Sequence, residues 1–91
     1  MGMDHYLVLK TSIDSCENAK NSAKLFYNII DAKLEFYGMI DDLKSRLTFF
    51  YSMPFEEFDI ADFGDIIEKD DVFVYKDFAG IHNIKIELIR L

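Results

Sequence analysis

This sequence has few of the residue patterns that usually reveal a chemical activity. Its single cysteine, Cys16, cannot form an intramolecular disulfide or the paired spacing of a zinc site. Its four glycines are scattered singly, which excludes a glycine-rich phosphate loop. No apolar run approaches the roughly 20 residues that cross a bilayer, and no basic stretch followed by an apolar one indicates a secretory signal. We therefore expect a cytoplasmic protein that has no membrane span, bound metal or cofactor.

The composition predicts a folded chain with one core. Ninety-one residues are too few for two ordinary domains, so we expect residues 1–91 to form a single small domain. Apolar residues make up 51% of the chain and aromatic residues 15%, well above the content of a disordered segment. So many large apolar side chains are hard to bury in a small body. The surplus suggests a homodimer or an exposed binding face.

Negative charge is concentrated in one stretch of the chain. The protein has 17 acidic and 10 basic side chains and a net charge of −7. Residues 54–71, PFEEFDIADFGDIIEKDD, hold eight of the acids and only one base, Lys69, and are called the acidic segment below. The rest of the chain has nine of each sign and is neutral. Because phosphate binding needs clustered Lys and Arg, we expect no direct nucleic-acid contact and a basic protein surface as the partner.

The first third of the chain is predicted to be a strand followed by a helix. His5–Ser12 (HYLVLKTS) is short and rich in Leu and Val, which favours a strand. Asp14 and Glu17 have the three-residue spacing of a capping box at a helix start. An apolar stripe then recurs every three or four residues, which predicts an amphipathic helix over Ser15–Ala32. The stripe consists of Cys16, Ala19, Ala23, Phe26 and Ile30.

Residues 33–53 can be interpreted in two ways. The stretches KLEFYGMID and RLTFFYSM both alternate along the chain, and the polar DDLKS lies between them, which predicts a hairpin of two strands. Aromatic enrichment and Gly38 favour this interpretation. The alternative is a continued helix with an apolar stripe at helical spacing. That stripe would contain Leu34, Tyr37, Ile40 and Leu43.

The last third is predicted to be a helix followed by a second hairpin. Pro54 suits the first turn of a helix, where its missing N–H would be unpaired in any case. Acidic residues directly after it suit the positive end of the helix dipole, so we expect a helix over Phe55–Glu68, with Gly64 as a point where it could break. DVFVYKDF and NIKIELIRL then form two strands, because Ile84, Ile86 and Leu88 alternate with charged residues.

Together these elements predict an α+β fold. The order is that of a ferredoxin-like βαββαβ unit with an added C-terminal strand, an antiparallel sheet with two helices on one face. Many unrelated functions occur on this order of elements, so the fold by itself indicates no activity.

The candidate catalytic residues form no recognisable constellation. His5 and His82 are the only histidines, and neither has a nearby Ser, Cys or carboxylate in a triad arrangement. Cys16 would lie in the first turn of the predicted helix, where the dipole could activate it, but it also belongs to the apolar stripe. Asp59, Asp62 and Asp65 recur every third residue, which is not the ligand spacing of a calcium loop. We therefore expect a protein that is not an enzyme.

The acidic segment is the strongest candidate for a contact surface. Carboxylates around an aromatic anchor would speed the encounter with a basic partner, and a phenylalanine would supply the contact energy that charges alone do not. We expect a small acidic binding protein that docks on and neutralises a basic partner, such as a protein that itself acts on nucleic acid. Immunity proteins, antitoxins and anti-defence inhibitors act in this way. The expected partner-binding residues are Phe55, Glu56, Glu57, Phe58, Asp59, Asp62, Phe63 and Asp65.

An alternative function is a ferredoxin-like regulatory or small-ligand-binding module that acts as a dimer. The stretch KTSIDSCEN offers hydroxyl groups and backbone N–H groups at the predicted helix start, where an anion could bind. Ser12, Asp14 and Ser15 could equally serve as ordinary helix caps. The two functions differ in location, since only the first depends on the acidic segment.

Overall fold

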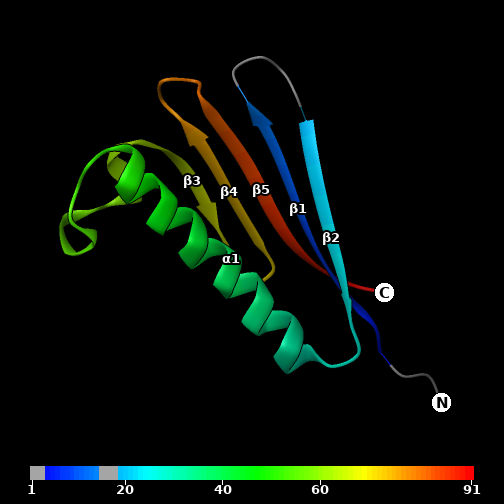
Figure 1. The fold of residues 1–91 in the computed structure, drawn as a ribbon. Coiled ribbons are helices and arrows are strands. Elements are labelled where there is room, and N and C mark those ends of the chain that lie inside the picture. The colour runs from blue at the N-terminus through cyan, green and yellow to red at the C-terminus, as the bar shows by residue number, and fades with distance from the viewer. Residues whose placement is uncertain (1–3, 15–18) are drawn as a thin grey trace.

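The structure is a single antiparallel sheet with one long helix across it (Figure 1). The computed structural model describes residues 4–14 and 19–91. In this part of the chain two strands precede the helix, and two short 3-10 helices and three strands follow it. The elements are β1 (Tyr6–Asp14), β2 (Ala19–Phe26), α1 (Ile29–Phe50), η1 (Phe55–Glu57), η2 (Ile60–Asp62), β3 (Gly64–Glu68), β4 (Val72–Asp77) and β5 (His82–Arg90).

The strands are arranged in the order β2-β1-β5-β4-β3. β1 pairs with β2 on one side and with β5 on the other, and β4 pairs with β5 and β3. The predicted strand at residues 5–12 and both strands of the predicted C-terminal hairpin are confirmed. Their alternation is also correct, because Ile84 and Ile86 are buried beneath the helix while Lys85 is exposed on the opposite face.

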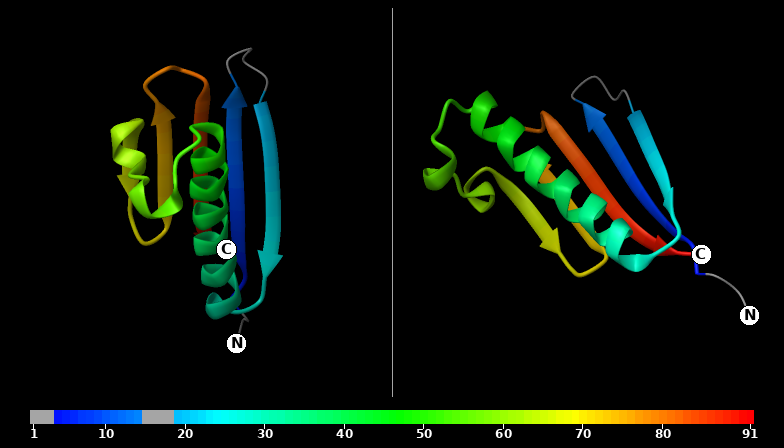
Figure 2. Two further views of the ribbon diagram at one scale, coloured as in Figure 1. Left: turned by 60° about the vertical axis from the view of Figure 1, so that its left-hand side comes forward. Right: turned by 60° about the horizontal axis from the view of Figure 1, so that its bottom comes forward.

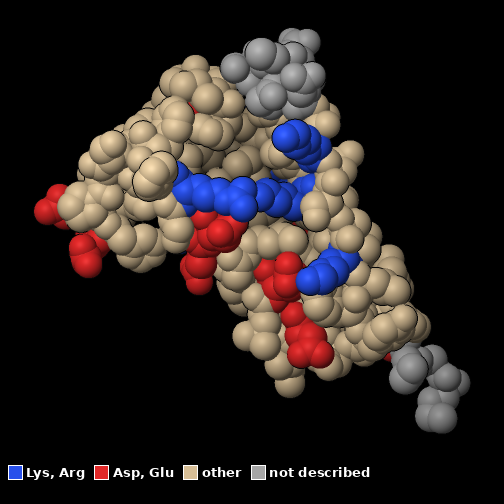
Figure 3. Space-filling model, viewed as in Figure 1, with Lys and Arg blue, Asp and Glu red and all other residues tan. Residues whose placement is uncertain are grey.

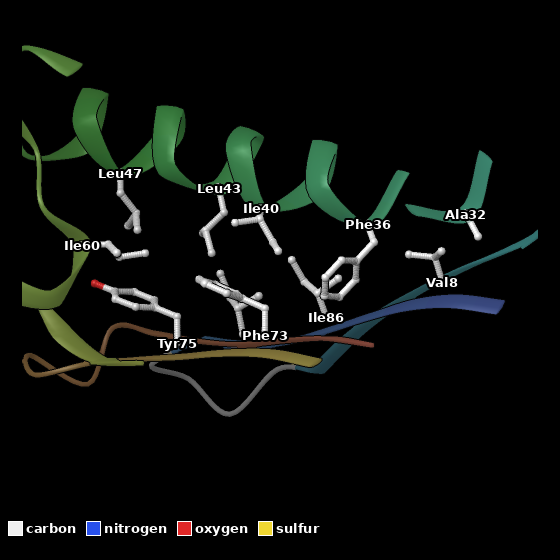
Figure 4. Close-up of a cluster of buried hydrophobic side chains, with 11 residues drawn as sticks. Val8, Ala32, Phe36, Ile40, Leu43, Leu47, Ile60, Phe73, Tyr75 and Ile86 are labelled. Carbon is white, nitrogen blue, oxygen red and sulfur yellow. The ribbon is translucent and has the colours of Figure 1, made fainter. Parts of the chain in front are cut away.

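Helix α1 crosses one face of the sheet diagonally (Figure 2). Its first turns lie over β1, where Ala32 is close to Val8, and its last turns lie over β4, where Leu47 is close to Tyr75 and Ile60 (Figure 4). The side chains that point at the sheet recur every three or four residues, as an amphipathic helix requires. They are Ala32, Phe36, Ile40, Leu43 and Leu47, all buried.

The α+β class and the antiparallel sheet agree with the prediction, but the ferredoxin-like order does not. The described residues form ββαβββ, with one α-helix in place of two. Both helices of the prediction were placed at the wrong residues, and the region predicted as a hairpin is the helix.

The predicted helix over Ser15–Ala32 is wrong. Residues 15–18 lie outside the described part, Ala19–Phe26 form β2, and the helix begins only at Ile29. β2 is an edge strand that is exposed along almost all of its length, so burial imposes no alternating apolar pattern on it. Its Ala and Lys residues prefer a helix, and pairing with β1 overrides that weak preference.

The helix starts at a pair of residues with the three-residue spacing that the prediction assigned to Asp14 and Glu17. The pair is Asn28 and Asp31. Asn28 is the N-cap residue, and its Oδ1 accepts a hydrogen bond from the backbone N–H of Asp31 at 2.8 Å. Its Nδ2 donates to Oδ2 of Asp31 at the same distance. This reciprocal pair resembles a capping box and ties down the first turn.

The predicted hairpin over residues 33–53 is wrong, and the alternative, a helix, is correct. Short stretches of this region do alternate, but only the helical spacing places the buried side chains on one face. The expected stripe was shifted, because Leu34 and Tyr37 are exposed on the outer face of α1. Gly38 also lies on this outer face and does not interrupt the helix.

The predicted helix over Phe55–Glu68 is also wrong. Pro54 does precede a helical turn, but η1 ends at Glu57, η2 covers only Ile60–Asp62, and Gly64–Glu68 form the edge strand β3. Gly64 is where the chain becomes extended, because β3 must approach β4 closely there. The poor helical periodicity of this region reflects these three short elements.

The face of the sheet turned away from α1 carries apolar side chains that no described residue covers. Leu7 lies opposite Leu25 on β2 and opposite Ile89 on β5, and Ile67 lies opposite Val74. Leu25 and Ile67 are about half exposed. The aromatic and aliphatic surplus seen in the composition is therefore partly on this face, and the expected homodimer stays a prediction.

Replacing Gly64 with alanine tests the close approach of β3 to β4. A Cβ atom at this position would lie 2.6 Å from Cε2 of the buried Tyr75 and would overlap the backbone carbonyl of Lys76. We expect Gly64→Ala to lower the free energy of unfolding by about 1–3 kcal/mol, because a rigid ring or strand must shift. Urea denaturation measures this loss.

Gly38 provides the matched control. No atom lies within 4 Å of a Cβ built there, on the exposed face of α1. Gly38→Ala should therefore raise the free energy of unfolding by about 0.5–1 kcal/mol through helix propensity. Equal effects of the two substitutions would contradict the proposed crowding at Gly64.

Candidate functional site

The acidic segment runs from the end of α1 around the side of the molecule to the edge strand β3 and its turn into β4. All eight of its carboxylate residues are exposed. None of them forms an ion pair with a residue that the structure describes, whereas acids elsewhere pair with Lys24, Arg46, Lys85 and Arg90. The charge of this segment is therefore not neutralised within the described chain.

Aromatic stacking holds the acidic segment against the body of the protein. Phe63 stacks on Tyr51 with ring centroids 4.2 Å apart, and Phe58 stacks on Phe63 at 5.3 Å. Ile60, which lies between Phe58 and Phe63 in the chain, is buried in the core. Two of the three phenylalanines are thus partly buried, and Phe55 is the one left 57% exposed.

A small hollow of about 210 Å³ lies between the acidic segment and α1. Its walls are Phe55 and Phe58, with the carboxylate residue Asp59 beside them, and Lys44 of α1 forms the remaining side. An aromatic wall next to a carboxylate can accommodate the aliphatic stem of a Lys or Arg while its charge meets the acid.

The predicted partner-binding residues differ in what they do locally. Asp59 accepts a hydrogen bond from the backbone N–H of Ala61 at 3.1 Å and so caps η2. Asp65 lies on β3, opposite Lys76 of β4. The other three carboxylates make no hydrogen bond within the described part of the chain and are free to meet a partner. They are Glu56, Glu57 and Asp62.

A second group of polar residues, which the sequence did not reveal, surrounds the buried carboxylate of Asp77. Its side chain is only 2% exposed. Oδ2 accepts a hydrogen bond from the hydroxyl of Tyr51 at 3.1 Å and lies 3.3 Å from Nδ1 of His82, and Oδ1 accepts from the N–H of Ala79 at 2.9 Å. His82 is held from its other side by Phe50, edge to face at 5.2 Å.

These contacts determine the ionisation of the group. Burial alone would raise the pKa of Asp77, but the hydrogen bonds from Ala79, His82 and Tyr51 stabilise the carboxylate and lower its pKa below the ordinary value. Burial and the hydrogen bond to Asp77 raise the pKa of Tyr51. Burial, with the added charge of Asp77, raises the pKa of Tyr75 far above its ordinary value. Asp77 is therefore ionised at neutral pH, and both phenols are neutral.

The sequence contained a signal for this group. Asp77 and His82 lie on either side of the β4–β5 turn, so the hairpin brings them together. Asp77 also closes the turn through Ala79, and Gly80 adopts φ +72°, which favours glycine. His82 was assigned no partner from the sequence, and the structure places Asp77, five residues earlier in the chain, beside it across the turn.

The other candidate residues are dispersed. His5 packs its ring against Tyr27, with centroids 5.0 Å apart. Ser15 and Cys16 lie outside the described residues, and Asp14, which was expected at the start of a helix, belongs to strand β1. In the described ranges 4–14 and 19–91, no three His, Cys, Asp or Glu residues form a group that could hold a metal ion.

No helix in the described part of the chain is long and apolar enough to cross a membrane. Comparisons with known protein families, with curated proteins and with solved structures give no match. Function must therefore be argued from the surfaces and cavities themselves.

Two phenylalanine substitutions test the hydrogen bonds around Asp77. The hydroxyl of Tyr75 is buried and close enough to Tyr51 to affect its ionisation, but it has no hydrogen-bond partner in the described structure. We expect Tyr75→Phe to leave the free energy of unfolding unchanged or slightly higher, because an unsatisfied polar group is removed. Tyr51→Phe should lower it by about 1.5 kcal/mol, because Asp77 loses a donor. If Tyr75→Phe is as damaging as Tyr51→Phe in thermal denaturation, the two hydroxyls are hydrogen-bonded to each other.

The lowered pKa of Asp77 predicts a pH dependence of stability. The unfolded carboxyl has a pKa of about 3.9, so the stabilisation is fully present above that value and is lost as the pH falls through the lower pKa of the folded state. Asp77→Asn should cost about 1.5–3 kcal/mol near pH 5. The difference between wild type and variant should shrink toward about pH 2, as measured by urea denaturation at each pH. A difference that stays constant over this range would show that the carboxylate charge does not matter.

Proposed function

We propose that this protein is a small acidic binding protein that docks on and neutralises a basic partner protein. Immunity proteins, antitoxins and anti-defence inhibitors act in this way. The observation that carries the proposal is a set of eight exposed carboxylates without ion pairs in the described structure, beside an exposed phenylalanine. The fold gains no stability from an exposed phenylalanine or from carboxylates without ion pairs, so stability does not explain these features.

The contact surface that we propose consists of the exposed side chains from Phe55 to Asp65 and the hollow beside Phe55 and Asp59. Its scaffold is rigid, because Phe58 and Phe63 are stacked and Ile60 is buried. A preformed surface loses little conformational entropy when it binds. Phe55 would be the apolar anchor and Glu56, Glu57 and Asp62 would surround it with charge, the arrangement of a buried contact with a polar rim.

The expected partner presents Lys or Arg side chains on a fairly flat surface. A basic side chain would enter the hollow beside Phe55 and Asp59, and its neighbours would meet the remaining carboxylates. Proteins that act on nucleic acid have such surfaces, because they bind phosphates with the same residues. Covering that surface would prevent the partner from binding its own substrate.

Charge reversal with a matched control tests this function. We expect the triple variant Glu56→Lys, Glu57→Lys and Asp62→Lys to weaken partner binding by roughly 100-fold or more, because like charges would face each other. Phe55→Ala should weaken it about tenfold. All four side chains are exposed, so stability should change by less than about 0.5 kcal/mol. The measurement is a pull-down from the cells that produce the protein, at about 0.05 M and about 0.3 M salt, followed by titration with the purified partner.

The control is Glu68→Lys, Asp70→Lys and Asp71→Lys, which makes the same change in net charge at the other end of β3. A basic protein that is retained by wild type and by the control, lost with the triple variant and with Phe55→Ala, and weakened by salt supports the proposal. If wild type and the triple variant retain the same proteins, the acidic segment is only a solvated surface. If the control loses the partner equally, net charge and not this contact surface is responsible.

The small-ligand module remains the second candidate, for one reason. Ser12, which the sequence placed near an anion site, borders a cleft of about 300 Å³. That cleft is independent of the acidic segment, and its chemistry is argued next.

A further inference from the structure

The diagonal path of α1 leaves one corner of the sheet uncovered. The last turns of α1 lie toward β4 and η2, whereas β1 and β2 lie on the other side of β5 (Figure 1). Between them is a cleft of about 300 Å³. It is lined by side chains from β1, β2, the outer edge of α1 and the start of β5.

The floor of the cleft is apolar. Leu43 and Leu47 of α1 and Ile84 of β5 are almost completely buried there. Ile13 and Ile81 lie at the rim and are about 40% exposed. A floor of this kind accommodates the organic body of a ligand and gains free energy by removing it from water.

The walls of the cleft are basic. Lys10, Lys20 and Arg46 come from β1, β2 and α1, and no described carboxylate lines the cleft with them. Pairing in the sheet explains part of this convergence, because Ser12 lies directly opposite Lys20, and Lys10 is two residues away on the same side of β1. Figure 3 shows Lys and Arg side chains gathered beside α1 on this side of the molecule.

Arg46 and His82, which both line the cleft, make contacts with carboxylates. Arg46 pairs with Asp42 at 3.0 Å on the helix surface, and its side chain is 71% exposed, so this weak pair can yield to a ligand. His82 also lines the cleft, and its Nδ1 is engaged by the buried Asp77 at 3.3 Å. The other ring nitrogen, Nε2, makes no hydrogen bond with a described residue. The Asp77 group therefore holds a histidine at the edge of the cleft.

We infer that this cleft binds a small organic phosphate. Three cations from three different elements suit a tetrahedral group with several negative oxygens, and Ser12 and Asn83 add neutral hydrogen-bonding groups. The apolar floor suits the remainder of such a molecule. Its volume is that of a small-molecule site, near the lower end of their range.

An extended polyanion is a poorer fit. Acidic side chains of α1 lie next to the basic ones on this face (Figure 3), and the whole protein carries a net charge of −7. These charges oppose a nucleic acid, which must be neutralised over many phosphates. The distant carboxylates act weakly on a single phosphate inside the cleft, since charges more than about 10 Å away are screened at ordinary salt.

The test compares three probes and two matched double variants. The probes are inorganic phosphate, 5′-AMP and adenosine, titrated into the full chain and followed by calorimetry and by amide chemical shifts. The cleft variant is Lys20→Ala with Arg46→Ala. The control is Lys24→Ala with Lys33→Ala, which removes the same charge from exposed positions that do not line the cleft. Lys24 is on the same strand and the same face as Lys20.

We expect phosphate and 5′-AMP to bind wild type and the control, and adenosine not to bind. The cleft variant should bind 5′-AMP roughly 100-fold more weakly, about tenfold for each charged hydrogen bond removed. The proposal is wrong if neither phosphate probe binds at about 10 mM, if adenosine binds as well as 5′-AMP, or if both double variants bind alike. It is also wrong if phosphate fails to bind while the cleft variant alone abolishes self-association, because the occupant would then be the acidic segment of a second copy.

Discussion

One helix has to cover a sheet of five strands, and most features of this protein follow from that constraint. A helix about 10 Å across cannot bury a face that is five strands wide. α1 buries the most by crossing the middle, from Val8 on β1 to Tyr75 on β4. The sheet on either side of its C-terminal half is then covered by other means or left open. η2 covers one side with Ile60, and the basic cleft lies on the other side.

The sequence predicts the buried centre of the sheet better than its edges. β1, β4 and β5 are rich in branched and aromatic residues, and each lies between two neighbours, so burial dictates their alternation. β2 and β3 are edge strands, and backbone pairing alone holds them in place. Ala23 and Lys24 therefore lie in a strand although neither residue type favours one. The helix was missed for a related reason, since Phe49, Phe50 and Tyr51 look like strand residues but end α1 or lie just beyond it.

The acidic segment was located from charge alone, and its secondary structure had no influence on that inference. The sequence could not say which phenylalanine would be exposed, because that depends on Tyr51, which lies at the end of a helix assigned as a strand. The cleft was beyond sequence analysis for a similar reason. Lys10, Lys20 and Arg46 converge only when β2 is a strand, and the sequence assigned that region to a helix. Of the residues that line the cleft, Ser12 and His82 were named beforehand, each for a different reason.

The position of β5 has a consequence for how the protein folds. β5 lies between β1 and β4, and among the described strands it alone joins the pair β1–β2 to the pair β3–β4. Until β5 has paired with both neighbours, β1 and β4 each present an open edge, and the sheet exists as two unconnected halves. β1 and β5 lie far apart in the sequence, and pairing between distant parts of a chain is slow to form. The joining of the two halves by β5 is therefore the slow step that we expect in folding.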